Sequence, residues 1–117
     1  MGNPVTHFEI TGKDGEALKK YYGDLFGWSI NSENSMNYGM IEAPDGRGAG
    51  GGISATQDGG PGVVTIYVEV PNAQEYLDRA ISLGGKVIMP VMAVPDGPTI
   101  ALFADPEGHI IGLAQGM

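Results

Sequence analysis

The sequence predicts an α+β domain in which one βαβββ unit, a strand followed by a helix and three further strands, occurs twice. Two observations predict it. An alternating segment is followed by an amphipathic helical pattern near the start of the chain, and the same order begins again near residue 63. The 117 residues have the length of one domain. We therefore expect a single domain over residues 1–117, with repeat units at about 4–57 and 62–117.

The first unit begins with an alternating segment, Val5 to Ile10, which is rich in strand-forming residues. Successive side chains of a strand point to opposite faces of the sheet. His7 and Glu9 therefore share one face, and Phe8 shares the other face with Ile10.

A helix follows, because Asp14 can cap its N-terminus, apolar residues recur at helical spacing, and Gly27 can end it. Three weaker strand patterns complete the unit, separated by a turn at Pro44-Asp45-Gly46. They lie around residues 28–30, around residues 36–42 and near Ile53.

The second unit repeats this order with a strand at residues 63–70, a helix capped by Asn72 and a glycine stop at Gly84. An offset of 58 residues places Thr65 on His7. Farther along the chain an offset of 62 superposes the turns at 43–46 and 105–108, and a short strand then ends the unit near residues 110–114. The repetition indicates that one supersecondary unit was built twice.

Composition excludes several kinds of site and partner. The chain has no cysteine, so disulfides, thiolate metal sites and a cysteine nucleophile are excluded. A formal net charge of −8 repels phosphate backbones and anionic lipid, which argues against nucleic-acid and membrane partners. The N-terminus lacks the pattern of a signal peptide, and no segment approaches the roughly 18 apolar residues of a membrane span, so we expect a cytoplasmic protein.

Three motifs resemble one known family. They are Thr-His-Phe-Glu-Ile at residues 6–10, Tyr-Gly-Asp-Leu-Phe-Gly-Trp at 22–28 and Asp-Pro-Glu-Gly-His at 105–109. Together with the repeat they resemble the vicinal oxygen chelate superfamily of glyoxalase I, bleomycin-resistance proteins and extradiol dioxygenases. The resemblance implies that the two units form an open, incomplete β-barrel around a cavity, with the helices outside. It also implies that His7 and Glu9 point into that cavity.

The resemblance implies four metal-ligand positions, which this chain mostly lacks. His7 fits the first position, but its repeat mate is Thr65. The two carboxylate positions fall at about Gly112 and within Gly50 to Gly52, where no side chain can coordinate. We therefore expect no metal cofactor. A displaced site for Ni, Zn, Fe or Mn remains an alternative, with Glu9, Tyr67 and Glu69 on the inward faces.

His7 and Glu9 are the candidate catalytic residues, because an imidazole beside a carboxylate can act as a general base. The alternative is a structural imidazole hydrogen-bonded to Thr65, Tyr67 or Glu9. His109, the second imidazole, is expected to be solvated. The candidate ligand-binding residues are apolar or aromatic, and core packing is the alternative for each. They are Trp28, Tyr38, Met40, Tyr67 and Phe103.

The glycine run at residues 48–52 is predicted to be a mobile loop leading into a thin strand. A flap over the cavity, or a place where another group approaches closely, is the functional alternative.

The function expected from these features is that of a metal-independent small-molecule-binding protein with a cavity around His7. The alternatives are a drug-sequestering binder like the bleomycin-resistance proteins, a divalent-metal lyase, isomerase or dioxygenase, and a metal-free acid–base catalyst. We also expect a homodimer, because chains of this family with a single pair of units often dimerise.

Overall fold

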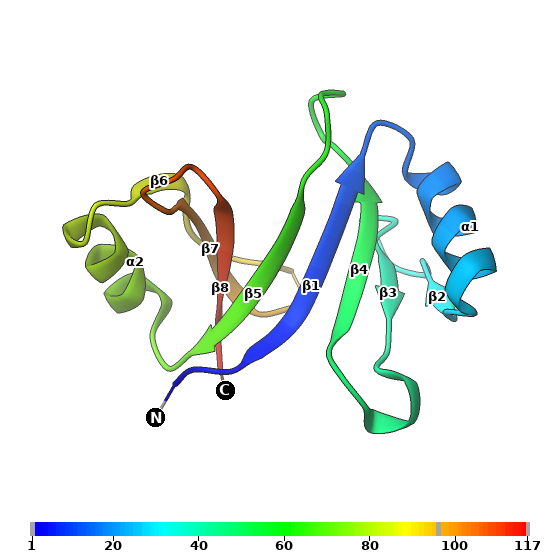
Figure 1. Ribbon diagram of the computed structural model, residues 1–117, viewed down its shortest axis with the longest axis horizontal. Helices are drawn as coiled ribbons and strands as arrows, with labels where there is room; N and C mark the ends of the chain where they lie inside the picture. Colours follow the sequence, from blue (N-terminus) through cyan, green and yellow to red (C-terminus); the bar gives the residue numbers. More distant parts are fainter. Residues whose placement is uncertain (1, 96, 117) are drawn as a thin grey trace. The chain divides into compact units, whose positions relative to one another are not determined.

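The computed structural model describes residues 2–95 and 97–116 (Figure 1). The chain divides into two compact units. The N-terminal unit is His7–Val64, and the C-terminal unit runs from Thr65 onward and includes the residues up to Thr6. The elements in chain order are β1 (Val5–Gly12), α1 (Gly15–Phe26), β2 (Ile30–Asn31), β3 (Gly39–Ile41), the 3₁₀ turn η1 (Pro44–Gly46), β4 (Gly50–Ala55), β5 (Val64–Val70), α2 (Ala73–Ser82), β6 (Lys86–Ala93), β7 (Thr99–Ala104) and β8 (Ile110–Gln115).

Each unit contains a four-stranded mixed sheet with the same connectivity. In the N-terminal unit the strand order is β2-β3-β4-β1, and β1 runs parallel to β4 (Figure 1). In the C-terminal unit the order is β6-β7-β8-β5, and β5 runs parallel to β8. The first and last strands of each unit are therefore neighbours, which confirms the predicted pair of βαβββ units.

Helix α1 begins and ends where the sequence predicts. The Asp14 carboxylate accepts a hydrogen bond from the backbone N–H of Ala17 at 3.0 Å, and Gly27 ends the helix with a φ of 70°. At its first residue the helix lies directly against β4, because a Cβ on Gly15 would be 2.6 Å from the backbone nitrogen of Ala55. On this side of the sheet four aromatic rings pack together, from Phe8, Tyr22, Phe26 and Trp28.

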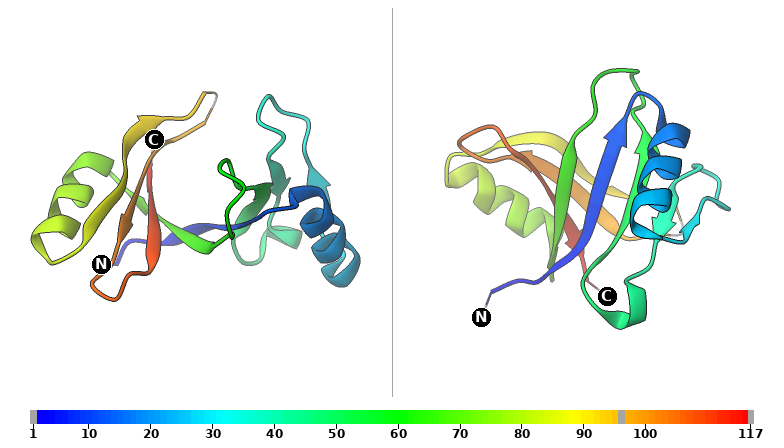
Figure 2. Two further views of the ribbon diagram at one scale, coloured as in Figure 1. Left: turned by 90° about the horizontal axis from the view of Figure 1, so that it is seen from above. Right: turned by 45° about the vertical axis from the view of Figure 1, so that its right-hand side comes forward.

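Helix α2 covers β6, β7 and β8 of the C-terminal unit, as the left view of Figure 2 shows for α2 and β6. Its N-cap is Asn72, whose side chain accepts a hydrogen bond from the N–H of Glu75 at 2.9 Å. The core beneath it consists of the buried residues Val70, Leu77, Ala101 and Leu113. In the described residues, neither helix has the length and apolarity needed to span a membrane.

The glycine run is the main correction to the prediction. Gly50, Gly51 and Gly52 are not a mobile loop or flap; they open β4, which lies between β3 and β1. His7, Phe8 and Glu9 of β1 are the parallel register partners of these three glycines. The positive φ of 80° at Gly48 lies just before the strand and is the part of the run that uses glycine's backbone freedom.

Candidate functional site

A polar cluster joins three side chains of the N-terminal unit. The hydroxyl oxygen of Tyr38 lies 2.8 Å from Nε2 of His7, and the same hydroxyl donates a hydrogen bond to Oε2 of Glu9 at 3.0 Å. His7 and Glu9 come from one face of β1, as predicted, and Tyr38 comes from the loop that precedes β3. The imidazole and phenol rings are stacked with an interplanar angle of 18°. We call this group the His7–Tyr38–Glu9 cluster.

Tyr38 can reach this position because residue 52 is glycine. A Cβ built on Gly52 would lie 1.9 Å from Cζ of Tyr38 and 2.0 Å from its hydroxyl oxygen, so the ring occupies the space that any side chain at residue 52 would need. Gly52 is also the register partner of Glu9. A phenol hydroxyl thus stands where the family resemblance would place a metal-binding carboxylate.

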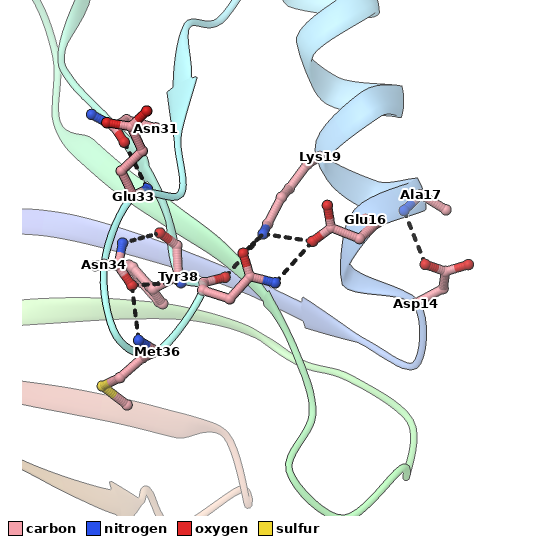
Figure 3. A network of polar contacts seen from close by, with 10 residues as sticks. Asp14, Glu16, Ala17, Lys19, Asn31, Glu33, Asn34, Met36 and Tyr38 are labelled. Carbon is pink, nitrogen blue, oxygen red and sulfur yellow. Dashed lines mark hydrogen bonds and ion pairs between the residues drawn. The ribbon is translucent and has the colours of Figure 1, made fainter.

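Asn34 holds the backbone of Tyr38 in place (Figure 3). Its side-chain oxygen accepts hydrogen bonds from the N–H groups of Tyr38 at 2.9 Å and Met36 at 3.2 Å. Its side-chain nitrogen donates to the carbonyl of Tyr38 at 2.7 Å. Because both backbone polar groups of Tyr38 are bound by one side chain, the ring leaves a fixed point of the loop.

A buried lysine supports the same loop from α1 (Figure 3). Lys19 is 8% exposed, and its ammonium donates to the carbonyl of Asn37 at 2.9 Å and to Glu16 at 2.8 Å. The amide of Asn37 also donates to Glu16 at 3.1 Å. These hydrogen bonds, from Lys19 first and then from Asn37, hold the pKa of Glu16 below its usual value. The helix thereby fixes the residue next to Tyr38, which has a φ of 53°.

Burial favours the neutral forms of both ionisable groups at the ends of the cluster. It lowers the pKa of the His7 imidazole from its ordinary 6.5. It raises the pKa of the Glu9 carboxyl from its ordinary 4.5, and the hydrogen bond from Tyr38 opposes part of that rise. The two shifts bring the proton affinities of the imidazole and the carboxylate closer together.

The C-terminal unit repeats the pairing of a tyrosine ring with a glycine. Tyr67, at the repeat position of Glu9, is the register partner of Gly112 on β8. A Cβ on Gly112 would lie 2.4 Å from the ring of Tyr67. Thr65, the repeat mate of His7, is 3% exposed and Tyr67 is 6% exposed. In both units, therefore, the predicted carboxylate position is filled by a tyrosine ring.

The remaining candidates are distributed over both faces of the sheets. Met40 is the register partner of Gly52, so it shares the face of the His7–Tyr38–Glu9 cluster, and it is 45% exposed. Trp28 contacts Phe8 on the opposite face, among the rings beside α1.

Two further candidates lie in the C-terminal unit. Phe103 packs against that unit's core and lines a surface hollow of about 350 Å³ together with Tyr76 and Arg79. The His109 side chain is 72% exposed and bonds to Asp105 at 3.0 Å, in agreement with the predicted solvated role.

Sequence reasoning had offered Thr65, Tyr67 and Glu9 as partners of His7 and had assigned Tyr38 to apolar contact. The contact between Tyr38 and His7 spans 31 residues of the chain. The signal that could have found it is Gly52, because a glycine in the middle of a sheet often marks a place where another group approaches closely.

The cluster's donor set does not fit a divalent transition metal. His7 supplies one nitrogen and Glu9 one carboxylate, and the hydroxyl of Tyr38 already bonds to both. A catalytic site usually needs about three protein ligands that converge on the ion. Over residues 2–95 and 97–116, no group of three or more His, Asp or Glu side chains is arranged to hold one. We therefore derive no chemistry through a metal, and the expected absence of a metal cofactor stays a prediction.

Curated proteins similar to this chain come from two groups of bacteria. It is 27% identical over 109 residues to CFP32 of Mycobacterium tuberculosis, which carries the name of a proposed glyoxylase. That match covers 87% of this chain and 41% of the relative. It is also 29% identical over 119 residues to the anthracycline biosynthesis protein DnrV of Streptomyces peucetius, with 86% and 42% covered. The chain thus spans about two fifths of the length of these relatives.

Solved structures with the same fold cover nearly the whole chain. The hypothetical protein BH1468 of Bacillus halodurans superposes with a TM-score of 0.73 at 12% identity, over 100% of this chain and 96% of the other. A methylmalonyl-CoA epimerase of Streptomyces coelicolor, in complex with 2-nitronate-propionyl-CoA, superposes with a TM-score of 0.69 at 18% identity, over 97% of each chain.

These likenesses agree with the predicted fold class, and the family model gives the assignment. The model of the Glyoxalase/Bleomycin resistance protein/Dioxygenase superfamily matches residues 5–113, which include all the strands except the last two residues of β8. The chain therefore belongs to the Glyoxalase/Bleomycin resistance protein/Dioxygenase superfamily.

Proposed function

We propose that this chain is a metal-independent small-molecule-binding domain whose ligand contacts the face of the N-terminal unit that carries the His7–Tyr38–Glu9 cluster. The single observation behind the proposal is that Tyr38 fills the space at Gly52 and links His7 to Glu9 through its hydroxyl. The cluster offers an imidazole, a phenol and a carboxylate, so it can both donate and accept hydrogen bonds.

Two other features support an organic ligand. Met40 lies exposed on the same face and adds an adaptable apolar surface beside the polar cluster. Relatives are named for glyoxylase chemistry and anthracycline biosynthesis, and one protein of the same fold holds a CoA derivative. All of these names refer to small organic molecules. The charge of −8 favours a cationic ligand through long-range attraction.

The binding proposal is tested by calorimetry with two classes of probe, cationic glycopeptides and neutral aromatic compounds. We expect one class to bind, and Tyr38→Phe to weaken its affinity about tenfold, the equivalent of roughly one hydrogen bond. Tyr21→Phe is the matched control, because Tyr21 lies on α1 and is 61% exposed. Failure of both classes to bind, or equal weakening by both variants, would refute the proposal. Binding of the glycopeptides alone would favour drug sequestration.

Elemental analysis tests metal independence. The protein is purified without chelators and analysed for Ni, Zn, Fe and Mn. We expect less than stoichiometric amounts of all four. One equivalent of any of them would instead favour a divalent-metal lyase, isomerase or dioxygenase.

Metal-free acid–base catalysis by His7 and Glu9 is the second candidate function. The observation that favours it is the opposite direction of their pKa shifts, which leaves both groups able to exchange a proton at mild pH. Turnover that is lost in both His7→Gln and Glu9→Gln, with ligand affinity retained, would distinguish catalysis from binding alone.

A homodimer in the cytoplasm is part of the same proposal. Light scattering at several concentrations measures the oligomeric state. A monomer mass at every concentration would contradict the dimer. Fractionation of cells that express the full-length protein tests its location.

A further inference from the structure

The hydrogen bonds of the His7–Tyr38–Glu9 cluster have a direction. A phenol hydroxyl has one proton, so Tyr38 can donate to one neighbour and must accept from the other. When Glu9 is a carboxylate it can only accept, so Tyr38 donates to Oε2 of Glu9 and accepts from Nε2–H of His7. The imidazole is then neutral with its proton on Nε2.

The opposite direction exists when Glu9 is protonated. Its O–H can donate to the oxygen of Tyr38, whose own proton then points to Nε2 of His7. The neutral imidazole must in that case carry its proton on Nδ1. The same three side chains thus have two complete hydrogen-bond patterns, which differ in the protonation of Glu9 and in the tautomer of His7.

We infer that Tyr38 is a proton-relay residue that couples the tautomer of His7 to the protonation of Glu9. A proton that arrives at Nδ1 of His7 forms an N–H bond there. The Nε2–H bond breaks as a new O–H bond forms on Tyr38, and the original O–H bond of Tyr38 breaks as an O–H bond forms on Glu9. One proton has entered, the imidazole stays neutral, and the charge of the cluster changes from −1 to zero.

Distances and burial support this relay. The 2.8 Å and 3.0 Å separations are ordinary hydrogen-bond lengths, so each proton moves along an existing bond. Burial lowers the pKa of His7 and raises that of Glu9, which opposes the alternative in which the proton stays on an imidazolium beside a carboxylate.

The surroundings in the N-terminal unit add little charge to the cluster. The neighbouring positions on β4 are glycines. On β3, Glu42 shares the face of Met40 by alternation and is exposed, and Glu33 in the loop is also exposed. The Lys19–Glu16 ion pair contacts Asn37 rather than the ring of Tyr38. The first proton taken up is therefore shared mainly among the three cluster residues.

This inference rests on the proposed use of the face for binding or catalysis, but its test needs no ligand. Nuclear magnetic resonance measures the ring ¹⁵N shifts of His7 and the carboxyl ¹³C shift of Glu9 on one sample between about pH 4 and pH 8. We expect His7 to change from the Nε2–H to the Nδ1–H neutral tautomer in the same step in which Glu9 is protonated. His109 reports an ordinary exposed imidazole in the same spectra.

Two variants complete the test. Tyr38→Phe removes the hydroxyl, keeps the ring over Gly52 and keeps the backbone bonds to Asn34. It should abolish the tautomer change and separate the two titrations. Glu9→Gln should leave His7 to pass directly to an imidazolium. An imidazolium in the first step of the wild type, or an unaltered tautomer change in Tyr38→Phe, would overturn the relay. Absence of ligand binding with the tautomer change present would instead refute the proposed function alone.

Discussion

Replacement of Gly52 by alanine is the sharpest perturbation of the cluster. The new Cβ would lie 1.9 Å from the ring of Tyr38, whereas ordinary van der Waals contact begins at 3.4 Å, so ring and strand must separate by about 1.5 Å. Such a shift stretches the 2.8 Å and 3.0 Å hydrogen bonds of the Tyr38 hydroxyl beyond bonding distance.

The cost follows from these two effects. Overpacking in a sheet costs about 1–3 kcal/mol, and two lost hydrogen bonds cost roughly 1 kcal/mol each. We expect Gly52→Ala to lower the free energy of unfolding by about 3–4 kcal/mol. Urea denaturation followed by circular dichroism measures this as a lower midpoint at an unchanged slope.

Two further variants make the reasoning refutable. Gly23→Ala is the matched control, because its Cβ meets neighbours at 3.5 Å and 3.7 Å within α1 and should stabilise the helix by up to about 1 kcal/mol. In a Tyr38→Ala background the ring is gone, so Gly52→Ala should cost about 1 kcal/mol or less. Equal costs of Gly52→Ala in the two backgrounds would show that Tyr38 is not the reason for the glycine.

Three other perturbations test the support of the cluster and its charge. Asn34→Ala removes three hydrogen bonds around Tyr38 and should cost about 2 kcal/mol in urea denaturation, whereas Asn31→Ala loses one and should cost less. Lys19→Met keeps the buried stem and should cost about 1 kcal/mol, and a neutral effect would contradict its anchoring role. Because the folded chain raises the pKa of Glu9, stability from that group is lost as pH rises through the raised pKa. The stability of Glu9→Gln relative to wild type should therefore grow with pH above about 4.5 and then level off, and a flat difference would contradict it.

Local patterns predicted most of the secondary structure. Both helices follow capping residues, Asp14 and Asn72, and begin 58 residues apart as the repeat requires. The face shared by His7 and Glu9 followed from strand alternation alone. The offset after the turn was less accurate, because β4 begins at Gly50 and β8 at Ile110, 60 residues apart rather than 62. The loops before the last strands differ in length, and no local pattern reveals that.

The strand at residues 50–55 was partly hidden for a physical reason. Strands are found by the alternation of side chains, and three consecutive glycines have no side chains to alternate. Their pairing with β1 and β3 is a long-range property that composition does not show. Phe8 lies over Gly51 and Tyr38 over Gly52, so each glycine is required by a ring on its own face of the sheet.

The glycines therefore carry a different argument from the one drawn from sequence alone. At first Gly52 and Gly112 only indicated missing metal-binding carboxylates. In the structure both lie beneath tyrosine rings, Tyr38 in one unit and Tyr67 in the other. A carboxylate could not return to residue 52 by a single substitution, because the ring of Tyr38 already occupies its space. In the N-terminal unit the hydroxyl of Tyr38 takes over that position and binds His7 to Glu9, so the loss of one functional group and the gain of another depend on the same glycine.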